Sequence, residues 1–174
     1  WAYTEGIGRD LEPIDGKFEL HQAYISTVPD YSGRVTVPTL WDKQEWTLVN
    51  NESADIIRML NTEFNEWGDS SLDFYPEDLR PEIDRLNEII YANVNNGVYR
   101  TGFAKSQETY ETGFTNLFNT FDEMDDLLGE RRFLCGDRVT EADWRFYVTL
   151  VRFDAAYYGN FKCNRQHIYE YHNL

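Results

Sequence analysis

The feature that most constrains the fold is a proline inside the most strand-like stretch of the chain. Val35, Val37 and Leu40 suit a β-strand, and Pro38 interrupts them. A proline within a strand lacks the amide hydrogen of the ladder, so it is tolerated only at a sheet edge or a special turn. A second apolar run, residues 46–49, follows a polar turn and predicts a neighbouring strand. The sequence therefore predicts a hairpin with an irregular edge.

A helix with a polar start is expected directly after this hairpin. Residues 50–53 read Asn-Asn-Glu-Ser, and Ile56, Ile57 and Leu60 follow with helical spacing. The interrupted strand and the polar helix start lie within the 27 residues 34–60. Both can offer backbone hydrogen bonds to a ligand.

The pattern changes between residues 65 and 80, where Gly, Ser and Pro gather. We expect a first domain over 1–64, a linker over 65–80 and a helical domain over 81–174. Helices are predicted from Pro81, over 106–128 and over 140–153, with a break at Asn95-Asn-Gly97. Thr140 and Asp143 form a variant of the capping box, which stabilises a helix start by about 1 kcal/mol.

Composition excludes several classes of partner. The net charge is −15, so nucleic acid and anionic membranes are unfavourable partners. No apolar run approaches the roughly 20 residues that span a bilayer. Acidic residues are abundant and only 4 lysines stand beside 12 arginines. This balance is typical of salt-loving organisms, and an ordinary acidic protein is the alternative. Cys135 and Cys163 are expected to be buried, reduced thiols of a cytoplasmic protein.

These elements in this order resemble a glutathione transferase, which implies a thioredoxin-like α/β domain, partial here, followed by an all-α domain. The closest resemblance is to the Xi class, the glutathionyl-hydroquinone reductases. It rests on four long motifs: Tyr31-Ser-Gly-Arg-Val-Thr-Val-Pro38, Asn50-Asn-Glu-Ser-Ala-Asp-Ile-Ile-Arg-Met59, Asn95-Asn-Gly-Val-Tyr-Arg-Thr-Gly-Phe-Ala104 and Thr140-Glu-Ala-Asp-Trp-Arg145. Residues 152–154 and 157–164 add to it.

The resemblance implies a glutathione site in the first domain. Pro38 would follow a cis peptide bond, and the Val37 backbone would pair with the cysteinyl part of glutathione like an added strand. Ser53, at a helix N-terminus, suits the γ-glutamyl carboxylate, and Glu52 suits its ammonium. Without the resemblance, Ser53 is an ordinary N-cap and Pro38 an ordinary turn residue. His21 falls near a position that contacts glutathione in relatives, and a plain surface histidine is an equal alternative.

The resemblance also implies that Tyr99 and Tyr157 face the substrate ring, where a phenol can donate to a developing phenolate. The alternative is a structural role, since the chain has 12 tyrosines. No metal is expected.

The chemistry of the family requires a thiolate from a Cys-Pro motif at the start of the thioredoxin-like domain. We expect this motif upstream of Trp1, and further helical sequence beyond Leu174. The 174 residues alone are then expected to be inactive. Neither Cys135 nor Cys163 has the context of the nucleophile.

Two alternatives stay open from the sequence. The chain can belong to a non-catalytic binding or interaction module, and γ-glutamylcysteine can replace glutathione in a salt-loving source. The resemblance further implies a homodimer.

Overall fold

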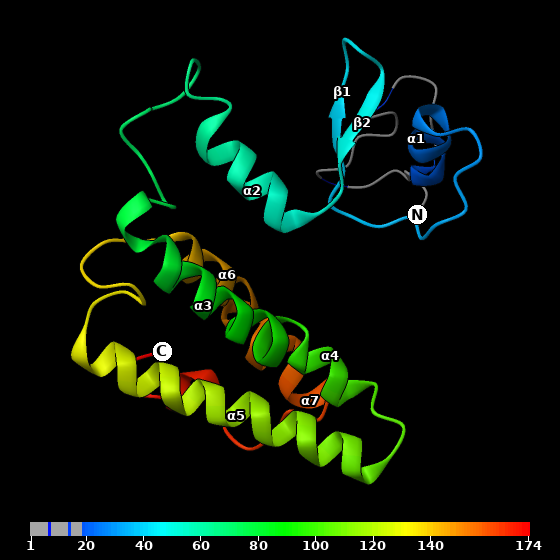
Figure 1. Cartoon of the computed structure of the whole chain (residues 1–174). Helices are drawn as coiled ribbons and strands as arrows, with labels where there is room; N and C mark the ends of the chain where they lie inside the picture. The colour runs from blue at the N-terminus through cyan, green and yellow to red at the C-terminus, as the bar shows by residue number, and fades with distance from the viewer. Residues whose placement is uncertain (1–6, 8–13, 15–18) are drawn as a thin grey trace. The chain divides into compact units, whose positions relative to one another are not determined.

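The described part of the chain forms two structural units, Trp1–Ser70 and Ser71–Leu174 (Figure 1). The computed structural model describes residues 7, 14 and 19–174. Within these residues, no helix combines the length and the apolarity that a membrane crossing requires.

The described part of the first unit contains a two-stranded sheet, and one helix precedes it and one follows it in the sequence. The order is α1 (Leu20–Thr27), β1 (Leu40–Asp42), β2 (Thr47–Asn50) and α2 (Ser53–Thr62). The strands are antiparallel, and the expected turn between them is confirmed. Asp42 closes this turn, because its carboxylate accepts hydrogen bonds from the amides of Gln44 (2.7 Å) and Glu45 (2.9 Å).

The predicted strand around Val35 and Val37 is wrong, because β1 begins only at Leu40. The backbone groups of Thr36 are bonded instead to a side chain: the amide and the carbonyl of Thr36 both pair with the hydroxyl of Tyr24. A residue whose amide and carbonyl are taken by a tyrosine cannot extend a ladder.

The second unit is helical throughout. Its main helices are α3 (Arg80–Ile90), α4 (Gly97–Gly102), α5 (Gln107–Glu130), α6 (Glu141–Arg152) and the short α7 (Tyr158–Asn160). Single-turn 3₁₀ helices cover Glu77–Leu79 and Ile168–Glu170. The apolar faces of α3, α5 and α6 meet in one core, in which the rings of Phe118, Phe121 and Phe153 pack edge to face.

The expected helix boundary at Asn95-Asn-Gly97 is confirmed, although it is not a loop. The α3 helix ends at Ile90, the π-helical turn Tyr91–Asn95 and the turn residue Asn96 follow, and α4 begins at Gly97. The side chain of Asn95 fixes this junction, because its amide donates to the carbonyl of Arg145 (2.9 Å) and the hydroxyl of Thr149 (2.8 Å) on α6. A second π-helical turn, Phe153–Tyr157, follows α6 where no helix is expected from the sequence.

The capping box at the start of α6 is confirmed. The carboxylate of Asp143 accepts hydrogen bonds from the amide of Thr140 (2.8 Å) and from the amide of Leu134 (2.8 Å). Thr140 is fully buried and Leu134 is 1% exposed, so water cannot replace this acceptor. Asp143 therefore joins the loop before α6 to the first turn of the helix.

We expect Asp143→Ala to lower the free energy of unfolding by about 2–4 kcal/mol, because it leaves two amides in a buried region without an acceptor. Urea denaturation followed by circular dichroism measures this loss. Asp137→Ala is the matched control, since Asp137 lies in the same loop and is exposed. Equal stability of the two variants would contradict the structural role of Asp143.

Candidate functional site

The segment before β1 contains one residue, Val37, whose backbone groups have no partner among the described residues. The Val37–Pro38 peptide bond is cis, as expected. Among the described residues, neither the amide nor the carbonyl of Val37 forms a hydrogen bond, and the residue is 57% exposed. Such a pair of free groups on an extended segment can bind a peptide-like ligand by strand addition.

The start of α2 supplies a second set of polar groups in the same unit. Glu52, and not Ser53, is the N-cap: one oxygen of its carboxylate accepts from the amide of Ala54 at 3.1 Å. Ser53 is the first helical residue and is exposed, and its amide has no partner within the described residues. Its hydroxyl makes only a long contact of 3.4 Å with Glu52. The first turn of α2 thus keeps donors free for an anion.

Thr36 connects these two places, which sequence reasoning missed. Its carbonyl accepts from the Tyr24 hydroxyl (2.8 Å), and its amide donates to the same oxygen (3.3 Å). Its own hydroxyl accepts from the side-chain amide of Asn51 (3.0 Å), next to Glu52 and Ser53. No local sequence pattern predicts these contacts, because Tyr24 and Asn51 are 12 and 15 residues from Thr36.

Tyr99 and Tyr157 meet in the second unit. Their hydroxyl oxygens are 3.1 Å apart, and the rings pack edge to face. Tyr99 is 42% exposed, whereas Tyr157 is 4% exposed. Burial, together with the hydrogen bond to Tyr99, raises the pKa of Tyr157 to about 12, so this phenol stays protonated at neutral pH.

Two phenylalanines extend this pair into an aromatic cluster. Phe103 stacks on Tyr99 at 6.3 Å, and Phe161 packs against Phe103 and both tyrosines at 5.3–5.4 Å between ring centroids. Sequence reasoning missed both, although each follows a site tyrosine by four residues, the spacing of neighbours on a helix. Phe103 is 71% exposed, so part of this cluster offers an aromatic surface to solvent.

Both cysteines are free and buried, as expected. Burial raises the pKa of Cys135, and it raises the pKa of Cys163 to about 12. A thiol of this kind forms little thiolate at neutral pH, which disfavours both sulfurs as nucleophiles.

Two further observations limit the site. His21 lies on α1 with about half of its side chain exposed, and its Nδ1 is 3.0 Å from a carboxylate oxygen of Glu19. Across the described residues, no group of three or more histidine, cysteine, aspartate or glutamate side chains is placed to hold a metal ion.

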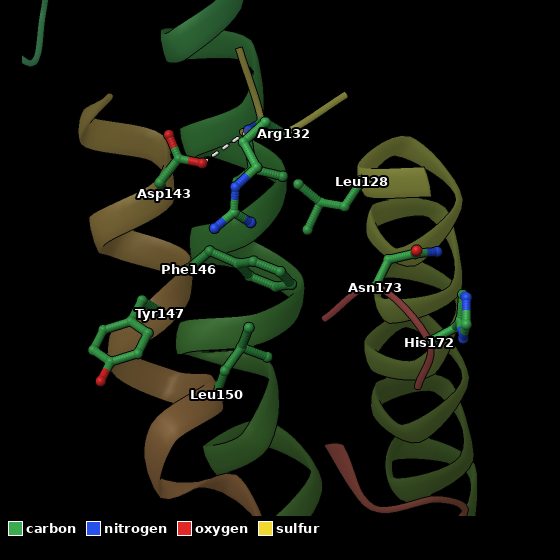
Figure 2. A pocket seen from close by; sticks show the side chains of 9 residues that line it. Leu128, Arg132, Asp143, Phe146, Tyr147, Leu150, His172 and Asn173 are labelled. Atoms are coloured by element: carbon green, nitrogen blue, oxygen red, sulfur yellow. Dashed lines mark hydrogen bonds between the residues drawn. The ribbon is translucent and has the colours of Figure 1, made fainter. Parts of the chain in front are cut away.

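A hollow of about 390 Å³ lies in the second unit, and none of the predicted site residues lines it (Figure 2). Its walls come from the end of α5, the loop after it, α6 and the last residues of the chain: Leu128, Arg132, Leu134, Asp143, Phe146, Tyr147, Leu150, His172 and Asn173. The carboxylate in it is that of Asp143, which already accepts the two amides of the capping box. The hollow also contains the polar side chains of Arg132, His172 and Asn173.

Comparison with protein families identifies both halves of the chain. The model for the N-terminal domain of glutathione S-transferases matches residues 10–63, and the model for the C-terminal domain matches residues 107–173. Among curated proteins, glutathionyl-hydroquinone reductase PcpF of Sphingobium chlorophenolicum is 50% identical over 174 residues, which is all of this chain and 56% of that protein. Glutathionyl-hydroquinone reductase YqjG of Escherichia coli is 50% identical over 155 residues, 89% of this chain and 47% of YqjG.

Solved structures agree with these matches. The glutathione-bound structure of Escherichia coli YqjG has a TM-score of 0.96 at 45% identity and covers 99% of this chain and 56% of its own. The Xi-class transferase of Natrialba magadii has a TM-score of 0.95 at 44% identity, and the match covers 99% of this chain and 53% of that structure's chain. The chain spans about half the length of these relatives. Both family models and both kinds of relative show that the chain belongs to the glutathione S-transferases, as expected from its motifs, and the solved structures that it resembles are of the Xi class.

Proposed function

We propose that this chain is part of a glutathionyl-hydroquinone reductase and that it supplies the binding groups for both parts of the substrate. The observation that carries the proposal is the Val37 amide and carbonyl, which have no partner in the described part of the chain and lie in the same unit as the open first turn of α2. The names of the relatives PcpF and YqjG, and the glutathione bound to YqjG, support the choice of ligand and reaction.

In the first unit, the γ-glutamylcysteinyl part of glutathione binds to two places. The amide and carbonyl of Val37, with Pro38 fixing the turn after them, pair with the cysteinyl residue as an added strand. The amide and hydroxyl of Ser53 hold the γ-glutamyl carboxylate, which the helix dipole of α2 favours. Glu52 binds the ammonium through the carboxylate oxygen that does not cap the helix. These contacts serve γ-glutamylcysteine equally well, because it has the same two groups.

The reaction needs a thiolate that Cys135 and Cys163 do not provide, so we place the nucleophile on a cysteine outside these 174 residues. This thiolate forms a disulfide bond with the sulfur of the glutathionyl-hydroquinone. The carbon–sulfur bond breaks, its electron pair goes to the ring carbon, and that carbon takes up a proton. A second glutathione, as thiolate, attacks the glutathione sulfur of the mixed disulfide. The two glutathione molecules leave as glutathione disulfide, and the protein thiolate is restored. The ring gains two electrons, and each of the two glutathione sulfur atoms loses one.

In the second unit, the tyrosine pair stabilises charge on the hydroquinone oxygen. Each phenol has one hydroxyl hydrogen, and the hydrogen bond between the two tyrosines uses one of these two hydrogens. The 3.1 Å between the two oxygens allows either phenol to be the donor, and we assign this role to the buried Tyr157. The hydrogen of the more exposed Tyr99 is then free for the substrate oxygen. The ring of Phe103 offers a face on which a planar quinone ring can stack.

A non-catalytic binding module is the second candidate, and the burial of both cysteines favours it. The two candidates differ in one experiment: reduction of glutathionyl-menadione by the full-length protein and by its upstream Cys→Ala variant. Activity that depends on this cysteine supports the reductase, and absence of any activity supports the module. The homodimer stays a prediction from the resemblance, and the cytoplasmic location stays a prediction from the two reduced cysteines.

We expect Ser53→Ala in the full-length protein to weaken glutathione binding roughly tenfold or more, since a hydrogen bond to a charged group is worth about 1.5–3 kcal/mol. Isothermal titration calorimetry measures this change. Ser26→Ala is the control, because the Ser26 hydroxyl only donates within α1, to the carbonyl of Gln22. Unchanged affinity in Ser53→Ala would remove Ser53 from the site.

We expect Tyr99→Phe to lower kcat for glutathionyl-menadione on the order of a hundredfold, because it removes a donor to the developing oxyanion. Tyr157→Phe keeps the ring but removes the hydrogen bond to Tyr99, and we expect kcat to fall roughly tenfold. Steady-state kinetics of the full-length protein measure both. Tyr169→Phe is the control, as this side chain is 74% exposed and its ring stacks only on His167. The pair has no catalytic role if both variants turn over at the wild-type rate.

We expect both cysteines of this chain to resist alkylation in the native protein and to react in urea, since burial suppresses their thiolates. Mass spectrometry after treatment with iodoacetamide counts the modified sulfurs. The variant Cys135→Ala is expected to keep full reductase activity in the full-length protein. Rapid native labelling of Cys163 would contradict its assignment as an inert core thiol.

A further inference from the structure

The segment that carries Val37 is held by side chains. Residues 34–39 lie outside the sheet, and no backbone–backbone hydrogen bond forms within them or from them to other described residues. The position of the Val37 amide and carbonyl therefore depends on side-chain contacts to the neighbouring residues.

Tyr24 supplies the main contact. Its side chain is 4% exposed on α1, and its hydroxyl takes both backbone groups of Thr36, the carbonyl at 2.8 Å and the amide at 3.3 Å. One phenol thus fixes both sides of the residue that immediately precedes Val37. The backbone groups of Thr36 are therefore bonded, whereas the amide and carbonyl of Val37 have no partner among the described residues.

Asn51 fixes Thr36 from the other side. Its side-chain amide donates to the Thr36 hydroxyl at 3.0 Å, and Asn51 stands two residues before Ser53. Thr36 consequently links α1, the Val37 segment and the start of α2 through consecutive hydrogen bonds. The two places that hold the γ-glutamylcysteinyl part are tied together at this residue.

We propose that Tyr24 is a positioning residue for thiol binding: through Thr36 it holds the Val37 backbone in register with the first turn of α2. This inference rests on the proposed function, because it assumes that Val37 and Ser53 bind glutathione. Tyr24 does not touch the ligand in this arrangement. It lowers the cost of binding, because the Val37 amide and carbonyl do not have to be ordered when the ligand arrives.

The test is Tyr24→Phe in the full-length protein. Phenylalanine keeps the ring and its packing on Tyr31, where the centroids are 4.9 Å apart, and removes only the hydroxyl. We expect the Kd for glutathione, measured by calorimetry, to rise roughly three- to tenfold, which corresponds to one or two lost hydrogen bonds. We expect a similar rise for γ-glutamylcysteine, and kcat at saturating glutathionyl-menadione within twofold of wild type.

Tyr31→Phe is the matched control. The Tyr31 hydroxyl donates to the carbonyl of Arg34 at 2.7 Å, so this variant also removes one tyrosine hydroxyl from the same segment, but not from Thr36. A change in Kd of less than twofold is expected. Equal weakening in both variants would indicate general loosening and overturn the positioning role, as would a large fall in kcat with an unchanged Kd.

The outcomes also separate this inference from the proposed function. If the wild-type protein binds no glutathione, the proposed function fails. If the wild type binds glutathione, Ser53→Ala weakens it and Tyr24→Phe binds as tightly as wild type, only the role of Tyr24 fails.

Discussion

The geometry of the first unit depends on the hydrogen bonds of one threonine. The Thr36 amide and carbonyl are taken by Tyr24, and its hydroxyl is taken by Asn51. These bonds engage the residue before Val37, so the strand begins only at Leu40, and the Val37 backbone has no partner among the described residues. In the proposed function, the same contacts that shorten the sheet also make the ligand-binding edge. A longer, regular strand would stabilise the sheet but would offer the ligand no fixed, unpaired residue beside α2.

In the proposed function, the chain separates binding from bond cleavage. The binding groups are backbone atoms and neutral or hydrogen-bonded side chains, which need no unusual protonation to work. The chemistry needs a thiolate, and burial raises the pKa of both thiols here. A buried cysteine in a helical core is a small apolar side chain in its effect on packing. This division explains how these residues can define the ligand and the ring-binding surface while leaving the reactive sulfur to another part of the protein.

Much of the fold could be predicted because it follows from local patterns. The apolar spacing of α3, α5 and α6, the capping box of Thr140 and Asp143, and the turn at Asp42 are each encoded within a few residues. The errors all came from contacts between distant residues. The start of β1 depends on Tyr24, which is 12 residues before Thr36, and the π-helical turn that ends at Asn95 is bonded to α6, 50 residues away. The identities of Val37 and Ser53 as site residues came from motif resemblance, whereas their open hydrogen-bonding groups are visible only in the structure.

The two π-helical turns connect the fold of the second unit to its tyrosine pair. One turn, Tyr91–Asn95, precedes the helix that carries Tyr99, and the other, Phe153–Tyr157, ends at Tyr157 itself. A π-helical turn adds one residue to the helix, which rotates all later side chains by about 100° around the axis. Ile90 before the first turn, Val94 within it and Val98 after it are all fully buried, so the extra residue is absorbed without loss of packing. An uninterrupted α-helix with the same core positions would point Tyr99 in another direction. Asn95, which binds the first turn to α6, therefore supports the aromatic site even though its side chain contacts neither tyrosine.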